Sequence, residues 1–334
     1  MTGSPIKRYS FTWPPRSLVW QGDELVDRIG AARWLEDGSP IMLGGRFPYT
    51  FDRALASPSG LYGALYAERQ TKGLLVDDGS MLREIDRSYC HADDYAYPIA
   101  LGRLCDGREV IAHCPKAYGR LEIDTLDKGK RLTRRRGKSQ DIFHSRLSFS
   151  PDGRFLLSAG WVWHPWNGFC IFDVARALED PRSLDREEGP FGAMQPSVTR
   201  GEVYAACWLD AERVLVTTDL RDLDHDEDEP TPASGIWSVP DGAWISQSTA
   251  WNPQASLFSC AGGVLYVENG HPHWWAPGME APLAWPDIAV VAAPGAESRN
   301  GIVHDCPLLA VHPTAPRFAA VTAEAILVVD LGDR

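Results

Sequence analysis

The feature that most constrains this chain is a repeated pattern of short apolar runs separated by tight-turn residues. In the clearest copy Leu147 and Phe149 alternate with polar residues, residues 150–153 read Ser-Pro-Asp-Gly, and apolar runs follow at 154–160 and 168–174. Proline presets φ at the second position of a turn, and glycine is favoured at the fourth. This segment therefore predicts three strands of an antiparallel meander.

The same pattern recurs along most of the chain. Equivalent turns fall at residues 59, 106, 152, 210, 262 and 314, so successive copies are 47, 46, 58, 52 and 52 residues apart. Four short strands with their turns need about 40 to 50 residues, which is the period of a propeller blade. Residues 1–50 contain enough strand-like runs for one more copy. The sequence predicts an all-β fold, a β-propeller of about seven four-stranded antiparallel blades in one domain over 1–334, with six blades as the competing count.

The last apolar run, at 325–330, is a third strand with almost nothing after it. A blade left open there would expose an edge that could pair with other chains. We therefore expect the N-terminal segment to supply the missing outer strand and close the ring, with 9–13 and 18–20 as the two candidates for that strand.

Four segments of the chain resemble known repeats. The Ser-Pro-Asp-Gly turn at 150–153, the strands at 171–174 and 327–331, and the His312-Pro313 turn resemble those of WD40-like and lactonase-like propeller proteins of bacteria. The chain departs from the WD40 pattern, because the Trp-Asp dipeptide is absent and Gly-His occurs once, at 270–271. The resemblance implies the propeller architecture, and its lactonase-like side suggests hydrolysis.

Charge and cysteine content narrow the possible partners. The formal net charge is −12 and the pI is about 5.2, whereas nucleic-acid binding needs a basic field. We expect no nucleic-acid partner.

The longest apolar runs are too short to cross a membrane, which predicts no membrane association. The seven cysteines are scattered, and Cys170 and Cys207 lie inside apolar runs. Such cysteines behave as small buried hydrophobes, and the chain is expected to be cytoplasmic.

Candidate metal ligands come from the residues that precede the first strand of each blade, because those strands converge where the central channel opens. Histidines and carboxylates there include His91, Asp94, His144, His304 and Asp305. Together they could hold a divalent metal at the channel mouth, since imidazole and carboxylate are common ligands of such ions. The simpler interpretation is that they are hydrogen-bonded linker residues. No other cofactor is expected.

A second group of candidates is aromatic. Indole rings that lie outside the core favour protein or sugar contacts, although tryptophans also pack between blades. The candidate binding residues are Trp161, Trp163, His164, Trp166, Trp274 and Trp275. The histidines at 271 and 273 could also bind a metal, but a turn followed by a buried strand explains that segment more simply.

Charged segments could orient a partner. Residues 220–230 are strongly acidic without matching an EF-hand loop, residues 128–138 are strongly basic, and 181–202 is a long polar segment. The basic run falls where an outer strand should lie, so a charged edge that blocks further strand pairing is the expected role.

These observations favour a non-enzymatic protein-interaction module, a WD40-like propeller scaffold that binds a protein partner through its Trp-rich and charged loops. One alternative is a metal-dependent hydrolase with its site at the mouth of the central channel. The other is a propeller that binds a small ligand or sugar through the tryptophans.

Overall fold

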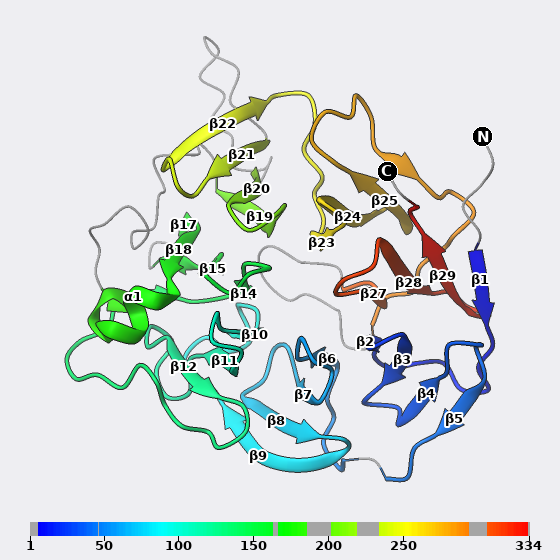
Figure 1. The fold of residues 1–334 in the computed structure, drawn as a ribbon, viewed down its shortest axis with the longest axis horizontal. Helices are drawn as coiled ribbons and strands as arrows, with labels where there is room; N and C mark the ends of the chain where they lie inside the picture. Colours follow the sequence, from blue (N-terminus) through cyan, green and yellow to red (C-terminus); the bar gives the residue numbers. More distant parts are fainter. Residues whose placement is uncertain are drawn as a thin grey trace. The chain divides into compact units, whose positions relative to one another are not determined.

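A computed structural model of the chain describes residues 6–45, 47–162, 166–185, 202–218, 234–293 and 306–332. Successive antiparallel sheets follow one another along the chain and make up the seven blades of a β-propeller (Figure 1), as the sequence predicted. No described helix has the length and apolar character needed to cross a membrane. The chain forms two compact units, 1–68 with 72–84 and 255–334, and 69–71 with 85–254. The prediction of one domain stays a prediction.

The first unit contains blades 1, 2, 6 and 7. Blade 1 is β2 (Val19–Gln21), β3 (Glu24–Asp27), β4 (Ala32–Trp34) and β5 (Pro40–Met42). Blade 2 is β6 (Arg53–Ala56), β7 (Tyr62–Tyr66), β8 (Lys72–Asp77) and β9 (Ser80–Asp86), whose last two residues belong to the second unit. Blade 6 is β23 (Phe258–Cys260), β24 (Gly263–Glu268), β25 (His271–Trp275) and β26 (Leu283–Ala284). Blade 7 is β27 (Leu309–Val311), β28 (Arg317–Val321), β29 (Ile326–Asp330) and β1 (Ile6–Tyr9).

Blade 7 is completed by the N-terminal strand, which confirms the predicted closure. Strand β1 runs antiparallel to β29, with Tyr9 opposite Ile326, and the blue and red strands lie side by side in Figure 1. The predicted segments were wrong, because the closing strand is Ile6–Tyr9 and β2 begins at Val19. The physical reason is burial: residues 18–20 are all buried, which suits the inner strand of a blade, whereas Ile6 to Arg8 are exposed as an outer strand requires.

The second unit contains blades 3, 4 and 5. Blade 3 is β10 (Ile99–Arg103), β11 (Glu109–His113) and β12 (Glu122–Thr125). Blade 4 is β14 (Ser148–Phe149), β15 (Phe155–Ser158) and β18 (Cys170–Asp173), followed by α1 (Val174–Glu179) and the short helix η1 (Pro181–Asp185). Blade 5 is β19 (Val203–Trp208), β20 (Arg213–Thr218), β21 (Ser234–Ser238) and β22 (Ala243–Ser248). A small extra sheet joins β13 (Ile142–Phe143), β16 (Trp161–Val162) and β17 (Trp166–Asn167).

Blades 3 and 4 depart from the predicted four strands. In blade 3 the basic segment lies antiparallel to β12, with Arg131 opposite Asp124 and the Leu132 amide donating to the Ile123 carbonyl at 2.8 Å. It takes the outer-strand position that the sequence predicted for it without forming a regular strand. In blade 4 the Asp173 carboxylate accepts a hydrogen bond from the Arg176 amide at 2.9 Å. This N-cap favours a helix directly after β18, so α1 follows the third strand.

Inner strands of neighbouring blades are joined by tryptophan in both units. In the second unit the Trp208 indole donates to the Ser148 carbonyl at 3.1 Å. In the first unit the Trp20 indole donates to the Ala310 carbonyl, also at 3.1 Å. A buried indole N–H needs an acceptor, and a strand carbonyl of the next blade provides one. Part of the high tryptophan content therefore belongs to packing between blades.

Candidate functional site

Four connections of the second unit emerge at one end of blades 3 and 4. In an antiparallel blade, the segment that enters the first strand and the segment between the second and third strands lie at the same end. For these blades the segments are 87–98, 114–121, 134–147 and the connection described at 159–162 and 166–169. Two of them touch, because a side chain at Gly119 would approach the Gln140 carbonyl oxygen to 2.1 Å. These connections carry the candidate site.

We call the aromatic cluster on these connections the aromatic platform: Tyr118, Phe143 and Trp161, with His91 and Tyr95 against them. The Phe143 ring is stacked between the other two, with centroids 4.0 Å from Tyr118 and 4.1 Å from Trp161. His91 meets Phe143 and Trp161 edge-on, at 5.7 and 6.0 Å, and Tyr95 meets Phe143 at 5.3 Å. Phe143 and Trp161 also face each other across β13 and β16, which brings their side chains together.

Carboxylates border the platform. The Asp94 carboxylate lies 2.8 Å from Nδ1 of His91, and the Tyr118 hydroxyl donates to Asp141 at 2.7 Å. The hydrogen bond to Asp141 raises the pKa of Tyr118 to about 12. In the loop that carries His91 and Asp94, Tyr89 is 85% exposed. The structure thus brings together His91 and Asp94, predicted as metal ligands, with Trp161, predicted as a binding residue.

The loop that carries His91 is held by Arg87, which is 4% exposed. Its guanidinium donates to the carbonyls of Gln70 at 2.8 Å, Tyr95 at 3.1 Å and Ala96 at 3.2 Å, and to that of Ala92. The same group lies over two tyrosine rings, 4.6 Å from the centroid of Tyr95 and 4.9 Å from that of Tyr97. One planar cation therefore fixes both sides of the loop, because its five donors reach several carbonyls at once.

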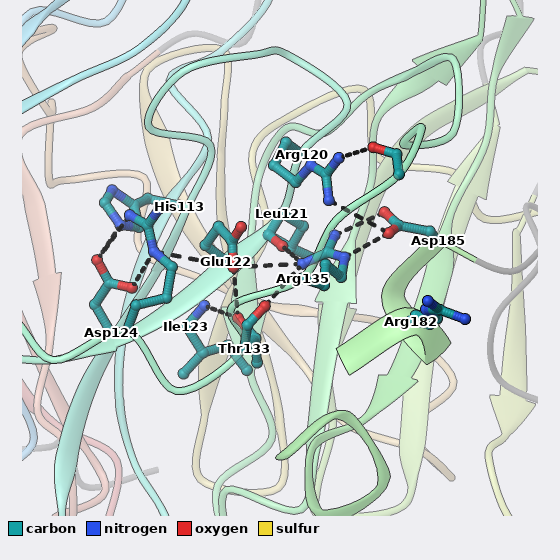
Figure 2. Close-up of polar contacts among 12 residues, drawn as sticks. His113, Arg120, Leu121, Glu122, Ile123, Asp124, Thr133, Arg135, Arg182 and Asp185 are labelled. Atoms are coloured by element: carbon teal, nitrogen blue, oxygen red, sulfur yellow. Dashed lines mark hydrogen bonds and ion pairs between the residues drawn. The ribbon is translucent and has the colours of Figure 1, made fainter. Parts of the chain in front are cut away.

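A second buried arginine holds the connection that carries Phe143. Arg135 binds Asp185 through two nitrogens, one of them at 2.7 Å, and it donates to the Leu121 carbonyl at 2.8 Å (Figure 2). Its Nη1 also lies 3.4 Å from Glu122. Side chains from blade 3, the 134–147 connection and η1 meet at this group. Because its partners span three segments, Arg135 fixes where that connection leaves blade 3.

The ionic network continues along blade 3. Asp124 accepts hydrogen bonds from Arg131 at 2.9 Å and lies 3.1 Å from Nε2 of His113, while Thr133 donates to Glu122 at 2.8 Å (Figure 2). Burial works to raise the pKa of Asp124, but the hydrogen bonds from His113 and Arg131 outweigh it and hold the pKa at about 2. Burial prevails at Glu122 and raises its pKa. Asp124 is therefore ionised and paired over the whole neutral range.

His144 lies in the core rather than among the platform residues. Its ring is fully buried, Nδ1 is 3.1 Å from the Ser158 hydroxyl, and Nε2 has no hydrogen-bond partner among the described residues. Burial, with a contribution from Arg135, lowers the pKa of His144 to about 3. The ring is therefore neutral at physiological pH and is packed against Phe172.

The predicted metal site stays a prediction. Within the part of the chain that the structure describes, no three side chains of His, Cys, Asp or Glu are grouped so that they could hold a metal ion. His304 and Asp305, the other two predicted ligands, lie outside the described residues. Of the predicted ligands that the structure describes, His91 and Asp94 are in direct contact with each other.

The other predicted aromatic binding residues lie in blade 6 or next to Trp161 in the sequence. Trp274 is buried and donates to the Cys260 carbonyl at 2.9 Å, and Trp275 donates to the Met279 carbonyl at 3.2 Å. Both indole N–H groups are therefore used within blade 6. Trp163 and His164 lie outside the described residues, and Trp166 is described as part of β17 without its side chain.

Of the predicted charged segments, the structure describes the basic one. Within the basic run Arg131 and Arg135 point into the ionic network, whereas Arg134, Arg136 and Lys138 are exposed. The acidic segment 220–230 lies outside the described residues, as does the polar segment 181–202 except for 181–185 and 202. The basic run is thus partly structural: two of its arginines stabilise blade 3 instead of facing solvent.

Sequence reasoning missed Arg87 and Tyr118, and it considered Asp141 only as part of the segment before the first strand of a blade, not as a candidate ligand. The available signal for Arg87 was its place between a predicted strand and a turn, with two tyrosines following at 95 and 97. Tyr118 and Asp141 join the platform through the packing of two connections, and neither has a local motif.

Comparison with known proteins supports the fold alone. No protein-family model matches the chain, and no curated protein matches it. Among solved structures, it is similar to a catalytically inactive His-to-Ala variant of virginiamycin B lyase from Staphylococcus aureus with quinupristin. That match has a TM-score of 0.57 and 12% sequence identity, and it covers 98% of this chain and 99% of that one. At this identity the likeness shows a shared seven-bladed β-propeller fold and does not transfer an activity.

Proposed function

We propose that this protein is a protein-interaction module whose partner docks on the aromatic platform. The observation that carries the proposal is the Tyr118–Phe143–Trp161 stack, on connections held by two buried arginines. Tyr89, in the loop that carries His91, is exposed. Tyrosine and tryptophan are enriched at the energetic centres of protein interfaces because they bury much area with few rotatable bonds.

Preorganisation supports the same proposal. A loop that must be ordered on binding costs conformational entropy, and a loop already fixed in place avoids that cost. The hydrogen bonds from Arg87 to four carbonyls fix the loop that carries Tyr89 and His91 before any partner arrives. Arg135 does the same for the connection that carries Phe143.

The test is affinity capture with the full chain, followed by binding measurements with purified components. We expect a protein that is captured by the wild type and lost with Trp161→Ala or Tyr89→Ala. Trp275→Ala is the matched control, because it removes an indole of another blade. The captured protein, once purified, should bind the wild type with a Kd at least tenfold lower than Trp161→Ala by calorimetry. Equal capture by all four proteins would refute the platform as the docking site.

The second candidate function is an enzyme, favoured by the lyase fold match and by the contact between His91 and Asp94. A carboxylate that orients an imidazole is a common arrangement for general base catalysis. Its test is metal analysis of untagged protein together with turnover of quinupristin and a panel of esters and lactones. Turnover that His91→Ala abolishes, with unchanged folding, would place this function first.

A further inference from the structure

The border of the aromatic platform is acidic where it touches the rings. Asp94 contacts His91 and Asp141 contacts Tyr118, while Asp93, in the same loop, is exposed. Asp94 and Asp141 therefore contact two different rings of the aromatic platform.

Aromatic faces and carboxylates attract the same kind of ligand group. A guanidinium or ammonium group is attracted by the negative face of an aromatic ring, and more strongly when the site is partly desolvated. Arginine can also stack flat on an indole or phenol ring while its edge pairs with a carboxylate. Trp161 and Tyr118 are half-buried, so part of each ring lies at the surface. The net charge of −12 adds a long-range attraction for cations.

Basic residues on the same connections act against a cation. Lys116 is exposed on the same connection as Tyr118. The exposed basic residues Arg134, Arg136 and Lys138 lie at the start of the 134–147 connection. There Arg135 pairs with Asp185 of η1, and Arg120 donates to the Gly137 carbonyl. Among the described residues, the charged groups that hydrogen-bond the rings of the platform are the carboxylates of Asp94 and Asp141.

We propose that the segment which docks on the aromatic platform is cationic: an extended arginine- or lysine-containing stretch of a protein partner. Its guanidinium or ammonium groups lie against Trp161 and Tyr118 and pair with Asp94 and Asp141. This inference rests on the proposed function and specifies the partner's chemistry.

The experiment measures fluorescence anisotropy of labelled Gly-Ser peptides that contain four Arg, four Lys, four Glu or no charged residue, titrated with the full chain. We expect the Arg peptide to bind more tightly than the Lys peptide, and the neutral and Glu peptides to bind least. The double variant Asp94→Asn/Asp141→Asn should weaken Arg-peptide binding about tenfold, and Trp161→Ala by a similar factor. Lys116→Ala should strengthen it about twofold, because it removes a repulsive charge.

The matched control is Glu268→Gln/Glu280→Gln, which removes two exposed carboxylates of blade 6, one in β24 and one in the loop between β25 and β26. It changes the net charge as much as the platform variant does, and it should leave the Kd unchanged. Equal weakening by both double variants would show unspecific attraction to an acidic protein and would overturn the inference.

The two proposals fail differently. Neutral or Glu peptides that bind in a Trp161-dependent way would overturn the cationic partner and leave the docking site standing. If no peptide binds and no captured protein depends on Trp161, both proposals are refuted.

Discussion

Removal of the Arg87 guanidinium should destabilise the protein more than the loss of any surface arginine. The group donates to four backbone carbonyls and lies against two tyrosine rings while 4% exposed. A hydrogen bond from a charged donor contributes about 1.5 to 3 kcal/mol, and part of that is offset because the variant no longer has to bury a cation. For Arg87→Met, which keeps most of the side-chain volume, we expect a loss of about 3 to 5 kcal/mol in the free energy of unfolding.

A second variant separates the effect of the several guanidinium donors from that of the positive charge, and a third serves as a surface control. Arg87→Lys keeps the cation but has three donors on one nitrogen, so it cannot reach all four carbonyls, and a loss of about 2 to 3 kcal/mol is expected. Arg108→Met is the control: Arg108 is exposed and pairs with Asp106, two residues away, so its loss should cost about 0.5 kcal/mol or less.

The measurement is urea unfolding followed by tryptophan fluorescence, with amide hydrogen exchange across 88–96 as the local readout. Arg87→Met should speed exchange in that loop before the blades open. A loss below about 1 kcal/mol, with unchanged exchange in the loop, would refute the idea that this cation holds the platform in place.

Three further predictions concern the supporting network and the core. The depressed pKa of Asp124 contributes stability above the unfolded value of 3.8, and this is lost as pH falls towards about 2. Asp124→Asn should therefore be less stable than wild type at pH 5, and urea titrations should show the gap shrinking by about 2 kcal/mol by pH 2. His144 stays neutral in the folded state to about pH 3, so the unfolded chain alone gains its proton as pH falls below 6.5. Stability should drop by about 2 kcal/mol from this group between pH 6.5 and 5, and His144→Gln should remove that slope; an unchanged slope would refute it. Finally, Gly119→Ala places a methyl group 2.1 Å from the Gln140 carbonyl oxygen and should cost about 3 kcal/mol in thermal or urea unfolding, whereas Gly44→Ala, with open space around it, should be neutral.

Blade number and blade boundaries could be predicted from the sequence because their signals are local. A turn such as 150–153 depends on proline and glycine dihedral preferences, and alternation of apolar residues depends on the two-residue period of a strand. Both survive in an isolated segment, so the turn at Gly153, with φ of +73°, and the strands on either side of it were predictable. The need to cover the last strand likewise predicted closure by the N-terminus, which β1 provides.

Tertiary structure alone decided which segment closes blade 7, what occupies the outer positions of blades 3 and 4, and where the platform lies. Residues 6–9 and 18–20 are both strand-like in sequence, and burial between neighbouring blades decides which becomes the inner strand. The platform joins residues 91, 118, 143 and 161, which are far apart in the chain. They meet because antiparallel strands return their connections to one end and because two buried arginines find their carbonyl and carboxylate partners there. Such contacts form between residues that are far apart in the sequence, so no local sequence pattern predicts them.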